Sequence, residues 1–457
     1  MLRLVTAATI AAATALAGLA ATATAQQTAP TTPTAPTAPT TPTAPAGPPT
    51  LDSLRLPRVV SAQQGHARFL VGVRLSAAAK LSVQVVKAQD GKIVQTSTDA
   101  SMRRAGRAYL RIEGVDDSGF QLLQGPYRLR IQASGQDGRT SRMLEAPFRL
   151  RLTPPRGLLD AYTVPLFPTF RRQAGTDTPG QLVAVVGPKG TVAAAGIRRG
   201  DVITAVNGRS VATSGGWSAA MRALAANTPA AVELVRRGAA MSVQVTPKPD
   251  WEKPPDYATS LSVAVRRAPA DFAYSFAQAR QLVEAGELVD ARELMDGWRA
   301  SWRDSAAGQL VAGDLLAKQV RWKQALGAYS RARARDETLA AAELGRGIAL
   351  SKLGKDRPSL VAFNAAGRLD PADAAAAGFR SYALLQEDRV PEAVAAGQTA
   401  VGLDPRYADA FLPLGIALLA AGDKANGVKA LRRGLVLLEE PDRAQRLIRA
   451  HLERADP

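Results

Sequence analysis

Side chains that could carry acid–base, nucleophilic or metal chemistry are few in this sequence and stand far apart. The chain has two histidines, His66 and His451, and no cysteine. Thiol nucleophiles, cysteine-ligated metals and disulfides are therefore excluded. No stretch has the spacing of a metal site, a Ser-His-Asp set or a phosphate-binding glycine loop. The carboxylate pair Asp116-Asp117 falls in a turn sequence, where side chains are usually solvated. We expect no catalytic residues, no metal and no cofactor.

The first fifty residues predict export. Arg3 precedes an apolar, alanine-rich stretch, and Ala23-Thr24-Ala25 is a small-x-small cleavage sequence. Residues 1–25 are therefore predicted to be a signal peptide, with an uncleaved anchor as the alternative. Residues 26–50 consist mostly of Thr, Pro and Ala, which cannot build a core, so a disordered stalk is predicted. We expect the protein in the periplasm, or outside the cell at the envelope.

The formal net charge of +18 is unevenly distributed. Lys and Arg outnumber Asp and Glu by 17 to 8 in residues 51–153 and by 11 to 5 in residues 154–250, whereas residues 251–457 are almost balanced. Such an excess can attract anionic envelope polymer or a lipid surface. The alternative is an arginine-rich solvated surface. Nucleic acid is not expected as a partner, because the basic stretches contain few aromatic residues.

Residues 51–153 alternate apolar with polar or basic residues in segments such as "ARFLVGVRL", "KLSVQVVKA" and "PYRLRIQAS". This period is typical of half-buried strands, and turn sequences between them favour a β-sandwich. The run "GVDDSGFQLLQGPYRLRIQASGQDG", with Gly125-Pro126-Tyr127 at the start of a long strand, resembles the last hairpin of the Ig-like module in flagellar hook-capping proteins.

Residues 154–250 contain the ordered motif "AGIRRGDVITAVNGRSV". Gly196 can take a positive φ after a short helical turn, Gly200-Asp201 can turn the chain into a buried strand, and Asn207-Gly208 is typical of a tight hairpin turn. The motif resembles the PDZ domain of bacterial high-temperature-requirement proteases, although Thr191 replaces the proline usual after Gly190. The resemblance implies an α+β fold, to which Gly196, Gly200, Asp201, Asn207 and Gly208 contribute as structural residues.

The resemblance also implies a groove in which an extended peptide adds a strand and its terminal carboxylate meets a loop. Arg156 stands where the family has an apolar residue, so it could hold a carboxylate, or the groove could be degenerate. The alternative for the helix positions is that they are core residues. The implied peptide-binding residues are Arg156, Gly157, Leu158 and Leu159 in the loop, and Trp217, Ala220, Met221 and Leu224 in a helix.

After a predicted linker at residues 251–271, the sequence repeats with a period of 34 residues. Small residues recur at one position of each unit, bulky residues recur at another, and glycines at 286, 354 and 422 fall between paired helices. The pattern resembles tetratricopeptide repeats. Residues 272–457 are therefore predicted to be an all-α solenoid of four to five units with a C-terminal capping helix.

The predicted fold class is thus multidomain: an all-β Ig-like sandwich (51–153), an α+β PDZ domain (154–250) and an all-α tetratricopeptide solenoid. Both resemblances imply binding of proteins or peptide C-termini. We therefore expect a non-enzymatic exported scaffold or adaptor. The alternative is a substrate-delivery or regulatory subunit of an envelope protease or cell-wall enzyme.

Overall fold

The computed structural model describes residues 48–65, 67–99, 101–187, 190–250, 256–438 and 443–455. The predicted signal peptide and nearly all of the predicted stalk lie outside these residues. The chain divides into two compact units, one built mainly from the strands before Pro154 and the other running from Pro154 to His451. None of the helices in the described ranges combines the length and apolar character that crossing a membrane requires.

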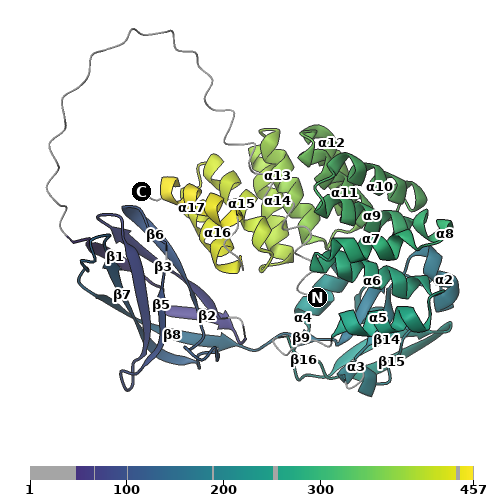
Figure 1. The fold of residues 1–457 in the computed structure, drawn as a ribbon, viewed down its shortest axis with the longest axis horizontal. Helices are drawn as coiled ribbons and strands as arrows, with labels where there is room; N and C mark the ends of the chain where they lie inside the picture. Colours follow the sequence, from purple (N-terminus) through teal and green to yellow (C-terminus); the bar gives the residue numbers. More distant parts are fainter. Residues whose placement is uncertain are drawn as a thin grey trace, which may run out of the picture. The chain divides into compact units, whose positions relative to one another are not determined.

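The first unit is a sandwich of two antiparallel sheets (Figure 1). One sheet has the order β1-β3-β6 and the other β2-β8-β7-β4-β5. Alternate residues of both sheets face one core, in which Phe148 contacts Phe69 of the opposite sheet and Tyr127 of its own. The strands are β1 Leu51–Arg55, β2 Val59–Gln63, β3 Arg68–Leu75, β4 Lys80–Lys87, β5 Ile93–Thr98, β6 Gly106–Glu113, β7 Gly125–Ser134 and β8 Leu144–Thr153.

The second unit begins with an α+β domain, residues 154–250, in which a six-stranded sheet has the order β10-β11-β12-β14-β15 with β13 paired to β12. A separate two-stranded ribbon joins β9 to β16. The strands are β9 Gly157–Leu158, β10 Ala161–Pro165, β11 Gln181–Val186, β12 Val202–Val206, β13 Arg209–Ser210, β14 Ala230–Arg236, β15 Ala239–Val245 and β16 Lys248–Pro249, and the helices are α2 Pro168–Ala174, α3 Thr191–Ala194 and α4 Ser214–Ala223.

Both hairpin turns of this domain use two successive residues with positive φ. Asn207 and Gly208 have φ of 49° and 71°, and Arg237 and Gly238 have φ of 50° and 86°. Such turns match the right-handed twist of the paired strands. Gly196 also has a positive φ of 81°, as the sequence predicted.

Paired antiparallel helices form the rest of the unit, hereafter the repeat array (Figure 1). Each pair follows the 34-residue period. The array contains α6 Phe272–Ala285, α7 Leu288–Asp296, α8 Ala300–Arg303, α9 Ala306–Lys318, α10 Trp322–Arg335, α11 Ala340–Lys352, α12 Asp356–Leu369, α13 Ala374–Gln386, α14 Val390–Leu403, α15 Ala408–Ala420, α16 Lys424–Leu437 and α17 Arg443–Ala455.

Small and bulky positions of the period meet inside the repeat array. A Cβ atom added to Gly347 would lie 2.5 Å from the ring of Phe363, and one added to Gly313 would lie 2.5 Å from the ring of Tyr329. Real Cβ atoms do not approach so closely, so these helix pairs need glycine to pack. The small residue and the bulky residue that recur with the period therefore contact each other.

Residues 251–271, expected to be a linker, instead include helix α5, Tyr257–Arg267. The carboxylate of Asp256 accepts a hydrogen bond from the Thr259 amide and caps the helix. Leu261 is fully buried, and the ring of Tyr257 packs against that of Tyr162 in β10. Tertiary packing against the α+β domain therefore orders a segment whose flanking prolines suggested a spacer.

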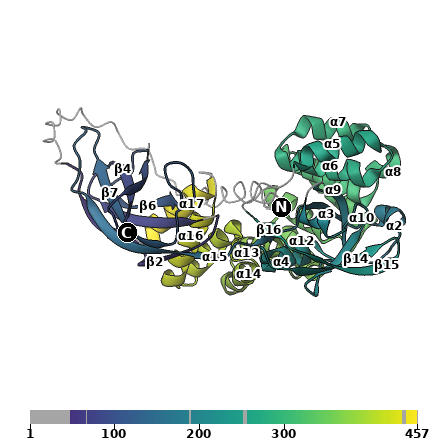
Figure 2. The same ribbon diagram turned by 90° about the horizontal axis from the view of Figure 1, so that it is seen from below.

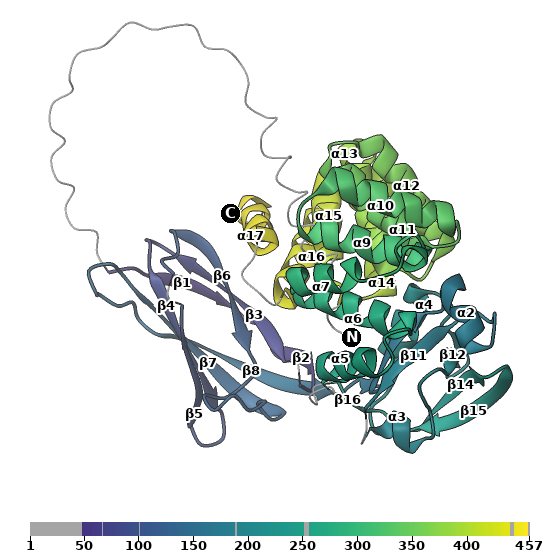
Figure 3. The same ribbon diagram turned by 45° about the vertical axis from the view of Figure 1, so that its right-hand side comes forward.

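The α+β domain and the repeat array share one hydrophobic core. Phe167 and Phe170, at the start of α2, contact Phe276 of α6, and Phe170 also contacts Phe272. Figure 3 shows α5 and α6 beside the sheet that contains β11. The two segments that the sequence suggested as separate modules are thus parts of a single packed unit.

Candidate peptide-binding site

Strand β10 and helix α4 form the two sides of the candidate groove. Within the described part of the chain β10 lies at the end of its sheet and pairs only with β11. An edge strand presents N–H and C=O groups that an added strand can bind. Ala161 of β10 packs in the same core cluster as Trp217 and Ala220 of α4.

The four helix residues predicted to line the groove differ in exposure. Trp217, Ala220 and Leu224 are at most 5% exposed and pack in the domain core, whereas Met221 packs against this core but is partly exposed. Met221 is therefore the predicted helix residue that a ligand could reach. Ser218, one turn earlier on the same flank, is exposed and was not predicted.

The predicted loop residues lie at the last turn of α4. The Gly157 amide donates a hydrogen bond of 2.7 Å to the Leu224 carbonyl, and Arg156 forms a β-bridge with Ala225. Leu158 pairs with Lys248 in the β9–β16 ribbon, and Leu159 is buried in the core. The Gly157 amide is thus engaged within the domain, and only the segment after Leu158 leads into β10.

Asp160, immediately before β10, explains why Thr191 stands where this motif usually has proline. Its carboxylate accepts hydrogen bonds of 2.9 Å from the amides of Thr191 and Val192 at the start of α3. Proline at 191 would lack the first of these N–H groups. The Asp160 side chain also passes so close to Gly190 that a Cβ there would overlap it.

The motif residue Asp201 forms a buried ion pair with a residue that is distant in sequence. Its carboxylate, 1% exposed, accepts two 2.7 Å hydrogen bonds from Arg236 of β14, one from Nε and one from Nη2. The Arg236 Nη2 also donates to the Gly196 carbonyl, and the pairing with Asp201 raises the pKa of Arg236. Asp201 and Gly196 are therefore structural residues of one contact network.

Helix α4 is held by the repeat array at its N-terminus. Asp370, in the turn between α12 and α13, accepts hydrogen bonds from the Gly215 amide at 2.6 Å and from the Thr213 hydroxyl at 2.8 Å. Thr213 in turn caps α4 by accepting from the Gly216 amide. A carboxylate at this position also complements the helix dipole. Figure 2 shows α4 beside α13 and α14.

A second anchor joins the start of the repeat array to the α+β domain. Asp271, the N-cap of α6, pairs with Arg199 and accepts a 2.7 Å hydrogen bond from the Gln173 side chain. The guanidinium of Arg199 also lies 3.8 Å from the ring centre of Tyr274. Acidic residues at the N-terminal ends of repeat helices therefore contact the domain at two separate places.

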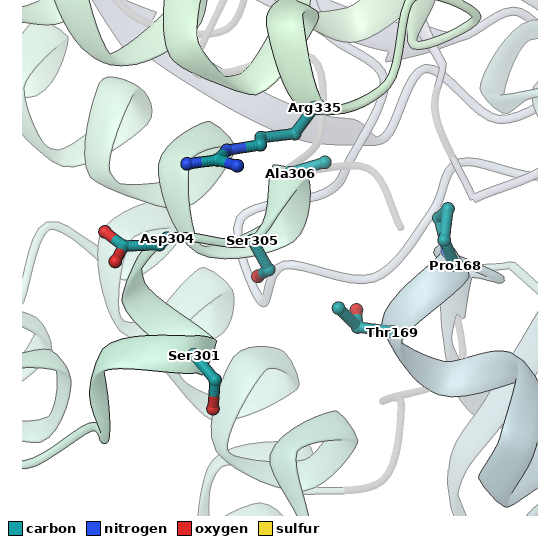
Figure 4. A pocket seen from close by; sticks show the side chains of 7 residues that line it. All are labelled: Pro168, Thr169, Ser301, Asp304, Ser305, Ala306 and Arg335. Carbon is teal, nitrogen blue, oxygen red and sulfur yellow. The ribbon is translucent and has the colours of Figure 1, made fainter.

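A shallow cavity of about 320 Å³ lies where α2 meets the repeat array (Figure 4). The Ser305 hydroxyl on its wall is engaged, since it donates to the Trp302 carbonyl and accepts from the Gly308 amide. No group of residues in the described ranges could hold a metal ion. The cavity is lined by Pro168, Thr169, Ser301, Asp304, Ser305, Ala306 and Arg335.

Sequence reasoning missed Asp160, Asp370 and the charged residues around Arg156. The "LDP" sequences at 369–371 and 403–405 did mark Asp370 and Asp404 as repeated turn residues. No local pattern shows that these two aspartates contact α4, because their partners lie more than a hundred residues away.

Comparison with known proteins identifies the α+β domain. Residues 169–246 match the PDZ domain family. No curated protein matches the chain.

Solved structures similar to this chain include several tetratricopeptide repeat proteins. YrrB, described as a TPR protein with an unusual peptide-binding site, is 20% identical, covers 42% of this chain and 98% of its own, and gives a TM-score of 0.32. MamA of Desulfovibrio magneticus RS-1 is 18% identical, covers 40% and 95%, and gives 0.32. A thermophilic TPR protein of Thermus thermophilus is 21% identical, covers 35% and 89%, and gives 0.32. PDZ and TPR folds are typically non-catalytic binding modules.

Proposed function

We propose that this protein is a non-enzymatic scaffold of the cell envelope that binds extended peptides, or the C-termini of proteins, between β10 and α4. One observation carries the proposal: β10 is a sheet edge beside a helix whose Met221 is partly exposed. Backbone groups of the edge supply affinity for an added strand, and the side chains of α4 supply selectivity. We base the envelope location on the predicted export signal. The resemblance of the motif to high-temperature-requirement proteases, and of the sandwich to hook-capping proteins, is also part of this proposal.

The repeat array supports the scaffold function in two ways. It holds α4 through Asp370, so that one wall of the groove is fixed before a ligand arrives. Its stacked helix pairs also provide a second surface, which in TPR folds commonly binds other proteins. A subunit that delivers substrates to an envelope protease or cell-wall enzyme is the second candidate, favoured by the PDZ match and by the protease resemblance of its motif.

The test is selection of a random peptide library with free C-termini against the full chain. We expect apolar C-terminal sequences to bind and their amidated versions to bind more weakly by about 1.5–3 kcal/mol, because charge-assisted hydrogen bonds to the carboxylate are lost. Ser218→Trp should block binding, since it adds bulk one turn from Met221 at an exposed position.

Ala223→Trp is the matched control. Ala223 is exposed but lies on the other flank of α4, so binding should persist. If a folded full chain selects no peptide, or if both tryptophan variants bind as well as the parent, the groove is not the recognition site.

A further inference from the structure

The outer face of the larger sheet of the sandwich carries four arginines. In β7, Arg128 and Arg130 alternate with residues that are buried in the core, and in β8, Arg149 and Arg151 do the same. Successive side chains of a strand point to opposite faces of its sheet, so these arginines share the face away from the core. Strands β7 and β8 are neighbours in this sheet (Figure 1).

The register of the two strands places the four arginines in one line, hereafter the arginine row. Arg128 is paired with Pro147, and Arg149 lies two residues further along β8. Side chains two residues apart in a strand are about 7 Å apart, and diagonal neighbours on adjacent strands are about 7–8 Å apart. The order along the row is therefore Arg130, Arg128, Arg149 and Arg151, over a length of about 20 Å.

Half of the arginine row is paired with a carboxylate of this chain. Glu145 Oε2 lies 2.7 Å from Arg130 Nε, and Glu145 Oε1 lies 3.3 Å from Arg128 Nη1. Arg149 and Arg151 are exposed, and among the described residues no carboxylate pairs with them. Glu145 is also the one acidic residue in the five strands of the sheet, all of which are described. The face therefore has an excess of positive charge.

The contacts of Glu145 indicate which kind of anion fits this spacing. One carboxylate is held by two consecutive arginines of the row, and the hydrogen bond from Arg130 lowers the pKa of Glu145. The planar fork of a guanidinium matches the two oxygens of a carboxylate. Arg149 and Arg151 repeat the same two-residue spacing. A ligand with carboxylates at regular intervals can therefore pair with the rest of the row.

The side chains beside the row suit a sugar polymer. Gln84 of β4 is paired with Arg130 on one side and with Thr96 of β5 on the other. Ser82 and Thr98 form the next outward-facing pair of these two strands. Among the described residues the amide and hydroxyl groups of these four side chains have no hydrogen-bond partner. They can therefore donate to and accept from the hydroxyl groups of a sugar.

A lipid surface fits this face less well. Lipid binding depends on apolar side chains that enter the membrane beside the basic ones. The large exposed apolar residues in the strands of this sheet are Val59 and Ile93, which lie in the two edge strands and not in the strands of the row. The row itself consists of charged side chains on a flat sheet, which favours a linear polymer laid along it.

We propose that the arginine row binds an acidic polysaccharide, a linear sugar polymer with regularly spaced carboxylates, along the outer face of β7 and β8. This inference does not rest on the peptide groove, because the row belongs to the first compact unit and the groove to the second. It gives the sandwich a function of its own: attachment to polymer, while the second unit binds peptides.

The test measures binding of the full chain to immobilised polygalacturonate. The methyl ester of the same polymer is the matched ligand, because its carboxylates carry no charge. We expect the free acid to bind, and the ester to bind at least about tenfold more weakly. Added salt should weaken binding of the acid, because the interaction of exposed charges is screened beyond about 10 Å at 0.1 M ionic strength.

Two double variants separate the arginine row from total charge. Arg149→Gln with Arg151→Gln should weaken binding about tenfold, because each exposed charge pair that is lost accounts for up to about fivefold. Arg74→Gln with Arg104→Gln removes the same charge from two exposed positions off this face, one in β3 and one between β5 and β6. This control should change binding less than about twofold, and thermal melts check that both variants fold.

A third variant acts in the opposite direction. Glu145→Gln keeps the size of the side chain but removes the carboxylate that pairs with Arg128 and Arg130. Both guanidinium groups then become available to the polymer, so polygalacturonate should bind more tightly. Unchanged or weaker binding by this variant would contradict a row that extends over both strands.

The other outcomes are equally decisive. No binding of polygalacturonate, equal binding of its methyl ester, or equal weakening by the two double variants would each overturn the inference. Tighter binding of polyphosphate than of polygalacturonate would make the face a phosphate-polymer surface. Binding to phosphatidylglycerol vesicles without binding to polygalacturonate would make it a lipid surface. Either result would overturn the assignment of an acidic polysaccharide and would leave the peptide groove unaffected.

Discussion

Single residues decide how the two parts of the second unit meet. Asp370 and Asp373 lie in the same turn, where Asp370 accepts hydrogen bonds from α4 and Asp373 caps α13 by accepting from the Ala375 amide. Burial, together with the nearby charge of Asp370, raises the pKa of Asp373 to about 6. The ionised form of Asp373 is therefore disfavoured in the folded protein.

This raised pKa predicts a pH dependence of stability. Asp373 binds a proton more tightly in the folded state than in the unfolded state, where its pKa is near the ordinary value of 3.8. The stability that this protonation contributes is therefore lost as the pH rises from about 4 to about 6. Asp373→Asn keeps a capping oxygen and should be more stable than the parent by up to about 2 kcal/mol at pH 7, and nearly equal to it at pH 4. Urea unfolding at both pH values measures this difference.

Asp423→Asn is the control, since Asp423 also caps a helix but hydrogen bonds from Asn426 lower its pKa. Its stabilising contribution should be present at neutral pH and should be lost as pH falls. If the stability difference between the parent and Asp373→Asn did not change with pH, the raised pKa of Asp373 would be contradicted.

Asp201 provides a second test at the residue scale. Asp201→Ala removes the partner of Arg236 from a place where the carboxylate is almost fully buried. Loss of one partner from such a pair destabilises by about 3 kcal/mol. Chemical denaturation should show this loss, whereas Asp177→Ala, at an exposed carboxylate 3.9 Å from Arg171, should have little effect. Equal effects would contradict a structural role for Asp201.

At the scale of elements, the first helix of each repeat pair ends in one recurring backbone conformation. Gly286, Val320, Gly354, Asp388 and Gly422 stand 34 residues apart, and all have φ between 55° and 86°. In each case the next amide bonds back to a carbonyl five residues earlier, such as Arg321 to Leu316. This is the helix-ending motif that favours glycine. The repeat therefore imposes a positive φ at this position even where the residue is Val320 or Asp388.

Val320 should therefore be a strained position. A β-branched residue tolerates positive φ poorly, and Val320 is 62% exposed, so it gains little from packing. Val320→Gly should stabilise the protein by about 1 kcal/mol. Asp388→Gly, at the equivalent place in another repeat, should gain less because aspartate tolerates this conformation better. Thermal denaturation compares the two, and a destabilised Val320→Gly would contradict the strain.

At the scale of the whole molecule, the shared core of the α+β domain and the repeat array predicts cooperative unfolding. Phe276 of α6 is fully buried and contacts both Phe167 and Phe170. Phe276→Ala should cost about 3 kcal/mol and lower one calorimetric transition that includes both segments. The transition of the sandwich should not change.

Phe148→Ala is the matched control, because Phe148 belongs to the core of the sandwich. It should lower the other transition alone. A Phe276→Ala protein in which the repeat array melts earlier while the α+β domain keeps its parent transition would show that the two segments fold independently.

The sequence by itself determined what depends on neighbouring residues. Alternation indicated the strands of the sandwich, Asn207-Gly208 indicated a hairpin turn, and the 34-residue period indicated the helix pairs with their recurring small and bulky positions. These features follow from backbone preferences and side-chain periodicity, which act over a few residues or repeat along the chain.

Only the tertiary structure decided which distant groups meet. Arg236 reaches Asp201, and Asp370 accepts a hydrogen bond from the Gly215 amide of α4. Tertiary packing also makes part of the expected linker a helix, because Leu261 becomes buried only when α5 packs in the folded unit. Such contacts depend on how whole elements pack, and a carboxylate in a turn has the same local sequence whether its partner is water or an arginine far along the chain.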